Sequence, residues 1–156
     1  MMKKAGGVFI VNDHADIAKA VDADGVHLGQ DDLPLEEGRR VMGPHKFIGI
    51  STHNIEQARA AEAGGADYIG FGPLFSTLTK DAGPERGLEM LRSIRNTVTV
   101  PILVIGGIKP ANAAEAIHAG ADGVAVISAV LSSSEPHRVI RTMIDNIGAV
   151  TSSTKR

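Results

Sequence analysis

The sequence predicts a parallel α/β fold, and three observations lead to this prediction. Six short apolar runs alternate with stretches of helical spacing, and glycine, proline, asparagine or aspartate bounds the runs. A weak internal repeat beginning with Ala-Asp opens three of the runs, at residues 23–26, 66–69 and 121–124. The 18 glycines suit tight turns between strands and helices. Repeated βα units of this kind imply a parallel sheet.

The predicted strands are continuous apolar runs, which is typical of strands buried on both faces. They cover residues 8–11, 24–28, 47–50, 68–71, 101–105 and 123–127. Helices are predicted from apolar spacing and from start residues such as Pro34, Asn54 and Pro110. They cover residues 15–21, 34–42, 55–63, 88–97, 110–117 and 136–147. Residues 1–7 resemble the end of a helix closed by a glycine.

A chain of 156 residues normally forms one domain with one core. We expect a single domain over residues 1–150 and a disordered tail over residues 151–156. Either a doubly wound sheet or part of a (β/α)8 barrel fits the strand pattern. No G-x-G-x-x-G motif follows the first strand, which disfavours the dinucleotide-binding form of the doubly wound sheet.

Composition excludes several classes of function. With 16 basic and 18 acidic side chains, no basic block and only 3% aromatic residues, the sequence gives no reason to expect a nucleic-acid partner. The absence of cysteine excludes disulfides, thiolate nucleophiles and cysteine metal sites. No G-x-S-x-G motif is present, which argues against an acyl hydrolase. No membrane span and no signal peptide are recognised, so a cytoplasmic location without membrane association is expected.

Ligands of parallel α/β folds bind at the carboxyl ends of the strands, so the residues that follow each strand form the candidate site. Asp13 and Asp32 follow successive strands, and two carboxylates suit Mg²⁺ held together with substrate phosphates. Their alternative role is to act as helix N-caps. His27 lies inside a strand, which favours a packed core residue over a catalytic base.

Two further strand ends suggest a phosphate site. Gly106 and Gly107 follow the fifth strand, and Ile127 and Ser128 close the sixth. Glycine lets backbone N–H groups approach an anion closely, although a tight βα turn would need the same small residues. The segment 77–80, Thr-Leu-Thr-Lys, adds two hydroxyls and an ammonium after the fourth strand, although an ordinary polar loop is the favoured interpretation of this segment when it is considered alone.

Taken together, these strand ends closely resemble thiamine-phosphate synthase. The resemblance extends in order from about residue 7 to residue 136. It rests on seven motifs, which are Ile-Val-Asn-Asp at 10–13, Gly-Val-His-Leu-Gly-Gln-Asp-Asp at 25–32, Gly-Ile-Ser-Thr-His at 49–53, Ala-Asp-Tyr-Ile-Gly-Phe-Gly-Pro at 66–73, Thr-Leu-Thr-Lys at 77–80, Ile-Gly-Gly-Ile at 105–108 and Val-Ile-Ser at 126–128.

The resemblance implies a (β/α)8 TIM barrel that joins hydroxymethylpyrimidine diphosphate to thiazole phosphate, with loss of Mg²⁺-bound pyrophosphate. It implies three groups of residues. Asp13 and Asp32 would bind Mg²⁺; Asn12, Ser51 and Lys80 would hold the pyrimidine diphosphate, with Lys80 and Ser51 as the catalytic pair; and Thr77, Thr79, Gly107, Ile127 and Ser128 would hold the thiazole phosphate. Neutralising the departing diphosphate would be the main catalytic task, assigned to Lys80.

One departure from the family pattern limits the predicted activity. The family has two earlier βα units with a Gln-x-Arg-x-Lys motif, which nothing in these 156 residues matches. The chain is therefore predicted to hold strands three to eight of an incomplete barrel. We expect weak or no synthase activity from the chain alone, unless a partner or a second copy in a homo-oligomer completes the barrel. The alternatives are a thiazole tautomerase-like enzyme, a non-catalytic phosphate-binding remnant, or a subunit that completes another fragment.

Overall fold

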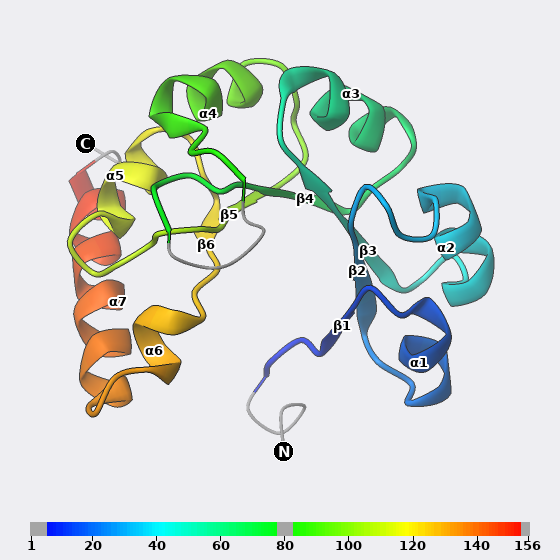
Figure 1. Cartoon of the computed structure of the whole chain (residues 1–156), viewed down its shortest axis with the longest axis horizontal. Helices are drawn as coiled ribbons and strands as arrows, with labels where there is room; N and C mark the ends of the chain where they lie inside the picture. Colours follow the sequence, from blue (N-terminus) through cyan, green and yellow to red (C-terminus); the bar gives the residue numbers. More distant parts are fainter. Residues whose placement is uncertain (1–5, 78–82, 154–156) are drawn as a thin grey trace. The chain divides into compact units, whose positions relative to one another are not determined.

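The computed structural model describes residues 6–77 and 83–153, and it confirms the predicted alternation of strands and helices (Figure 1). Two compact units divide the chain. The first unit contains residues up to Gly70 together with Val98–Pro101, and the second contains Phe71–Thr97 and the residues from Ile102 onward. The single domain predicted from the sequence stays a prediction, because the structure defines the fold within each unit.

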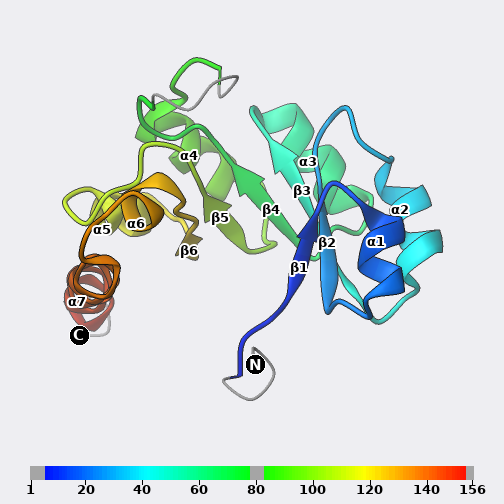
Figure 2. The same cartoon turned by 60° about the horizontal axis from the view of Figure 1, so that its bottom comes forward.

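The first unit contains a sheet of strands in chain order, which are β1 (Ile10–Asn12), β2 (Gly25–Leu28), β3 (Phe47–Thr52) and β4 (Tyr68–Phe71), where β4 ends at the unit boundary. Strand β2 pairs in parallel with both β1 and β3. Along one face of these strands lie the helices α1 (Ala15–Ala20), α2 (Leu35–Met42) and α3 (Ile55–Ala63) (Figure 2). Val26, Leu28 and Ile48 are fully buried and form the centre of this unit.

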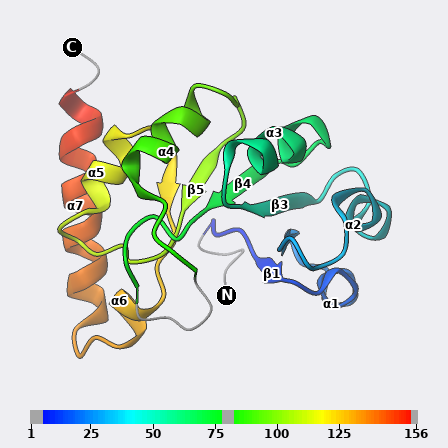
Figure 3. The same cartoon turned by 45° about the horizontal axis from the view of Figure 1, so that its top comes forward.

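The second unit contains β5 (Ile102–Val104) and β6 (Gly123–Val124), which pair in parallel with Leu103 opposite Gly123. Its helices are α4 (Gly87–Arg95), α5 (Ala113–His118), α6 (Ser128–Leu131) and α7 (Pro136–Ser153). Helix α7 lies alongside α5 (Figure 3) and also packs against α6. The core of this unit includes the buried side chains of Leu91, Ile94 and Val104.

The Ala-Asp repeat has one structural role in both units. In each copy the aspartate carboxylate accepts a hydrogen bond from a backbone amide near the start of the preceding strand in the chain. The three bonds join Phe9 N to Asp24, Ile48 N to Asp67 and Ile102 N to Asp122, at 2.8, 2.7 and 2.8 Å. The alanine before each aspartate is buried. The repeat therefore fixes the amino ends of the strands, which explains why it recurs in the sequence.

Several predicted boundaries are wrong, and local hydrogen bonds explain the clearest cases. The sixth strand ends at Val124 rather than Ile127, and Ile127 (φ −122°, ψ −79°) is instead the N-cap of α6. Helix α5 starts at Ala113 rather than Pro110, since the Asn112 carboxamide accepts the Lys109 amide and holds a turn there. Helix α7 continues to Ser153, into the segment expected to be a disordered tail.

No helix within residues 6–77 and 83–153 combines the length and apolar character that crossing a membrane requires.

Candidate functional site

Asn12 is the last residue of β1, and Asp13 begins the turn that follows it. Asp13 adopts a left-handed backbone conformation (φ 65°), which aspartate tolerates better than most residues with a side chain. Its amide donates to the His27 carbonyl at 2.8 Å, and its carboxylate accepts from the Asn12 side-chain nitrogen at 2.7 Å. Helix α1 has His14 as its N-cap, so the alternative role of Asp13 as a helix N-cap is wrong. The carboxylate is instead held at the carboxyl end of β1, exposed to solvent.

Asp32 follows β2 in the same unit and is also held by a local bond. Its Oδ2 accepts from the Gly29 amide at 2.6 Å, which closes the turn directly after the strand. The N-cap of α2 is Pro34, so the N-cap alternative is wrong for Asp32 as well. One carboxylate oxygen thus stabilises the turn. The second carboxylate of the predicted pair therefore lies beyond the carboxyl end of the neighbouring strand.

His27 connects three strands of the first unit through its ring. Its Nε2 lies 2.9 Å from the Ser51 hydroxyl of β3, and its Nδ1 lies 3.1 Å from the Tyr68 hydroxyl of β4. The His27 and Tyr68 rings stack with centroids 5.5 Å apart. Gln30 donates its side-chain nitrogen to the Ser51 carbonyl at 2.6 Å, so Ser51 is held from two sides. The sequence predicted a packed core residue at His27. In the structure this residue is half-buried, and both of its ring nitrogens are hydrogen-bonded.

Electrostatics links the two carboxylates to this ring. Burial lowers the pKa of His27 below its ordinary value, while the negative charges of Asp13 and Asp32 act in the opposite direction and have the smaller effect. The imidazole is therefore neutral at pH 7, and one of its nitrogens is a donor and the other an acceptor. Burial and the charge of Asp67 raise the pKa of Tyr68 to about 12, so its hydroxyl keeps its proton.

Glycines inside two strands make room for these rings. A Cβ on Gly49 would lie 2.0 Å from Cζ of Tyr68, and a Cβ on Gly70 would lie 2.9 Å from Cε1 of His27. A glycine inside a strand often marks a close approach by another group. Sequence reasoning missed His27 and Tyr68 as site residues. Gly49 and Gly70 are the signal that could have indicated them, although neither identifies its partner.

In the second unit, Gly106 and Gly107 form the predicted turn after β5. Both have a positive φ, of 92° and 66°, and both contact the segment after β4 closely. A Cβ on Gly106 would lie 2.5 Å from Pro73, and one on Gly107 would lie 2.5 Å from the Ser76 carbonyl. Glycine is therefore required here for conformation and space. The Asn112 side chain donates to the Gly107 carbonyl at 3.0 Å and holds the turn to the start of α5.

The structure describes some of the other residues predicted to hold phosphate. Ser76 is exposed and Thr77 is half-buried, and both follow the segment that packs on the Gly106–Gly107 turn. Ile127 is 61% exposed, and Ser128 begins α6. Thr79 and Lys80 lie outside the described residues. The second unit therefore presents a glycine turn and hydroxyl-bearing residues, while the position of the predicted catalytic lysine is not described.

The oxygen donors of the first unit fit a hard divalent cation that is completed by a ligand. Asp13 and Asp32 supply carboxylates, and Asn12 and Gln30 supply amide groups beside them. Within the described residues, no group of three or more His, Cys, Asp or Glu side chains could hold a metal ion by itself. Mg²⁺ commonly uses one or two protein carboxylates together with substrate phosphates, so this pair suits it without a third acidic residue.

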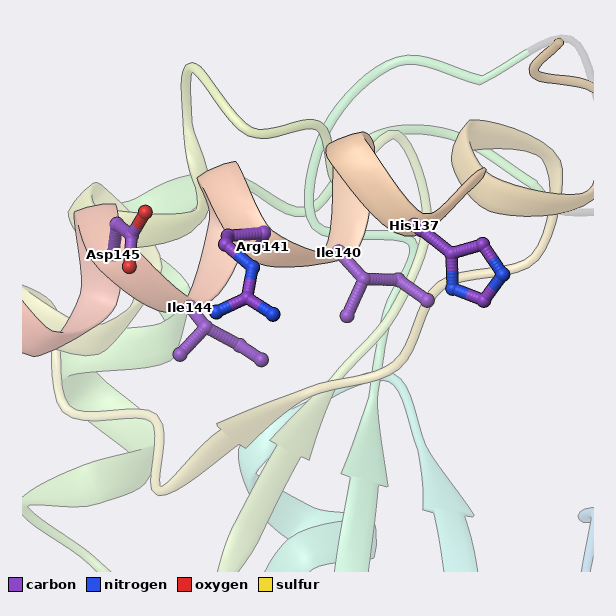
Figure 4. Close-up of a pocket in the computed structure, with 5 residues that line it drawn as sticks. All are labelled: His137, Ile140, Arg141, Ile144 and Asp145. Carbon is purple, nitrogen blue, oxygen red and sulfur yellow. The ribbon is translucent and has the colours of Figure 1, made fainter. Parts of the chain in front are cut away.

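A separate cavity of about 230 Å³ lies along α7 (Figure 4). Its lining comprises His137, Ile140, Arg141, Ile144 and Asp145, all from that helix. None of the described residues of the predicted site lines this cavity, so it is separate from them.

A protein-family model described as thiamine monophosphate synthase matches residues 1–130. A thiamine-phosphate synthase from Moorella thermoacetica is 54% identical over 136 residues, which are 86% of this chain and 65% of that protein. A second, from Chloroflexus aurantiacus, is 52% identical over 136 residues, covering 86% of this chain and 62% of the relative. The chain thus spans slightly less than two thirds of the length of these relatives.

A solved structure of a similarly named protein has the same fold as this chain. Thiamine phosphate pyrophosphorylase from Pyrococcus furiosus superposes with a TM-score of 0.87 at 40% identity. The alignment covers 96% of this chain and 71% of that structure. The predicted barrel-type α/β fold, with six consecutive βα units, is therefore confirmed.

Proposed function

The chain belongs to the thiamine monophosphate synthase family, and we propose that it forms the larger part of a transferase site that joins hydroxymethylpyrimidine diphosphate to thiazole phosphate. The products would be thiamine phosphate and pyrophosphate. One observation supports this proposal above the others: Asp13, Asp32 and Ser51 all act on a single ring, that of His27. A pair of carboxylates suited to Mg²⁺ therefore stands beside a polar group suited to a heterocycle.

Asp13 and Asp32 are the proposed Mg²⁺ ligands in this site. Each is oriented by a local hydrogen bond, from Asn12 and from the Gly29 amide, so that little reorganisation is needed on binding. When bound, Mg²⁺ would offset the negative charge that develops on the departing diphosphate. Asn12, the last residue of β1, is proposed to hold the diphosphate with its side chain.

His27 is proposed to position Ser51 rather than to transfer a proton. Because the imidazole is neutral at pH 7, its bond with Ser51 fixes the direction of the serine hydroxyl. Tyr68 occupies the other ring nitrogen and prevents His27 from rotating. The Ser51 hydroxyl is proposed to contact the pyrimidine, and it has the fixed orientation that recognition of a flat heterocycle needs.

The second unit is proposed to hold the thiazole phosphate. The Gly106–Gly107 turn has the left-handed backbone that leaves N–H groups able to face an anion. Thr77, Gly107, Ile127 and Ser128 are the described residues assigned to this role, and Thr79 is assigned with them by the resemblance. Lys80 is proposed to neutralise the leaving diphosphate, together with Ser51 as the second catalytic residue.

Calorimetric binding of hydroxymethylpyrimidine diphosphate, with and without Mg²⁺, tests the proposal. We expect binding that requires Mg²⁺, and Asp32→Asn should weaken it by at least about tenfold. Asp31→Asn is the matched control, because it removes the same charge from the adjacent, exposed residue and should leave the affinity unchanged. Equal affinity with and without Mg²⁺, or equal losses in the two variants, would contradict the assignment and would favour a tautomerase-like or remnant function.

Turnover by the isolated chain is a separate question. The Gln-x-Arg-x-Lys motif that the family uses for the diphosphate is absent from these 156 residues, so two of the expected cations are missing. We therefore predict weak or no product formation from both substrates and Mg²⁺, even where the pyrimidine diphosphate binds. Robust turnover would show that the six βα units are sufficient.

A further inference from the structure

An open cleft of about 510 Å³ lies in the first unit, between α2 and α3. Leu33, Pro34, Leu35 and Ile50 give it an apolar side, and Ala60, Ala61 and Gly64 line it from α3 and its C-cap. At one edge of the cleft, Gly64 lets the Leu35 side chain pack closely, since a Cβ on Gly64 would lie 2.8 Å from it. A volume of this size falls within the range of small-molecule sites.

The charged groups of the cleft have one sign. Among the described residues that line it, the two charged side chains are the carboxylates of Asp32 and Glu56. The other polar lining side chains are the amides of Gln30 and Gln57. Hydrogen bonds hold both glutamine side chains in place. Gln30 donates to the Ser51 carbonyl, and Gln57 accepts from the His53 amide. The cleft therefore pairs a negative rim with an apolar wall.

We propose that this cleft binds a small organic cation whose charged head meets Glu56 and Asp32 and whose apolar body lies against Leu35 and Ile50. A protonated amine or amidine on a flat ring has this chemistry, because it offers positive charge and N–H donors at one end only. An anion would meet two carboxylates, and a fully apolar ligand would leave both of them unpaired.

The test uses three probes that share a phenyl ring and differ in charge: benzamidinium, benzamide and benzoate. Each is titrated into the ¹⁵N-labelled chain without divalent cations, while the backbone amide signals are followed by NMR. We expect benzamidinium to shift the signals of Ala60, Ala61 and Gly64 saturably, with benzamide binding more weakly and benzoate not binding.

Two variants and one control locate the site. Glu56→Gln should weaken benzamidinium binding about three- to fivefold, as expected for a partly exposed charge pair. Ala60→Leu fills the cleft from an exposed helix position and should abolish the shifts. Glu115→Gln is the matched control, since Glu115 occupies the first turn of α5 as Glu56 occupies that of α3, and it should change nothing.

Three results would overturn the proposal: no saturable shift with any probe, equal affinity for benzamide and benzamidinium, or an unchanged affinity in Glu56→Gln. Mg²⁺ added alone must leave the Ala60 and Gly64 signals in place, because the same shifts with Mg²⁺ would indicate a metal site instead. The substituted residue is Glu56 rather than Asp32, so failure of the proposed synthase site would leave this test unaffected.

Discussion

The two ends of the strands use aspartate in different ways. At the amino ends, Asp24, Asp67 and Asp122 each bind a backbone amide of the preceding strand, and two of them also pair with an arginine. At the carboxyl ends, the carboxylates of Asp13 and Asp32 accept hydrogen bonds from groups within three residues in the chain. The amino-end carboxylates therefore connect elements, whereas the carboxyl-end carboxylates are held in place without joining strands.

This difference separates stability from function. A carboxylate that joins two elements contributes to the free energy of folding, because its loss leaves a strand-end amide without its acceptor. A carboxylate that is oriented only by its own turn contributes little to folding and remains able to take a ligand. Conserved chemistry at the carboxyl ends and structural bonds at the amino ends are the usual division in barrel-type folds.

Asp67→Ala should have the largest effect on stability. It removes the acceptor of the Ile48 amide and the partner of Arg39, at 2.7 Å each. We expect a loss of about 2–3 kcal/mol in the free energy of unfolding, measured by urea denaturation. Asp24→Ala removes the Phe9 amide bond and should lose about 1–2 kcal/mol. Asp145→Ala on the exposed face of α7 is the control; a loss there as large as that of Asp67→Ala would count against the comparison.

Gly49→Ala should disturb the carboxyl-end site with a smaller loss of stability. The added methyl would overlap the Tyr68 ring, which must turn away and release His27. Overpacking of this kind costs about 1–3 kcal/mol, and we expect the low end because the half-buried Tyr68 can move. The readout is unfolding together with Tyr68 fluorescence, since Tyr68 is the only tyrosine in the chain. Unchanged fluorescence would show that the His27–Tyr68 contact survives.

Asn54→Ala should lose about 1 kcal/mol. The Asn54 carboxamide accepts from the Gln57 amide at 2.8 Å and caps α3, as the sequence predicted. Asn54 follows the carboxyl end of β3, yet its side chain caps a helix. The variant therefore tests whether a residue at a carboxyl end can contribute to stability without contributing to ligand binding. Thermal unfolding should show the loss, while Mg²⁺-dependent ligand binding should be retained. A loss of binding greater than the loss of stability would place Asn54 in the site.

The smallest expected effect is that of pH on the free energy of unfolding, through His27. Because the pKa of His27 is lower in the folded chain than its ordinary value of 6.5, the unfolded chain takes up a proton first as the pH falls. The contribution of His27 to stability is therefore complete above about pH 6.5 and decreases below it. His27→Gln should flatten the pH dependence of unfolding in that range. A slope that is the same in wild type and His27→Gln would contradict the lowered pKa.

Sequence patterns predicted the fold because the strand signals are local. Continuous apolar runs and the Ala-Asp repeat placed all six strands, and β4 matches its predicted bounds. The end of β6 and the start of α5 were misplaced because a backbone turn at Ile127 and the Asn112 side chain decide them. Neither feature has a strong signal in the apolar pattern.

The candidate site was predicted less completely. Asp13, Asp32 and Ser51 were identified because they follow strands, but the contacts that unite them run through His27 and Tyr68, 41 residues apart. No local pattern shows which two side chains meet across a sheet. Thr79 and Lys80 lie outside the described residues, so their predicted roles stay predictions.

The most direct test of the division between strand ends measures stability and Mg²⁺-dependent binding of hydroxymethylpyrimidine diphosphate in the same two variants. Asp13→Asn should bind at least about tenfold more weakly, with the free energy of unfolding changed by less than about 0.5 kcal/mol. Asp67→Ala should show the reverse, with a large loss of stability and unchanged affinity while the chain remains folded. Parallel losses of stability and affinity in both variants would contradict the separation of roles.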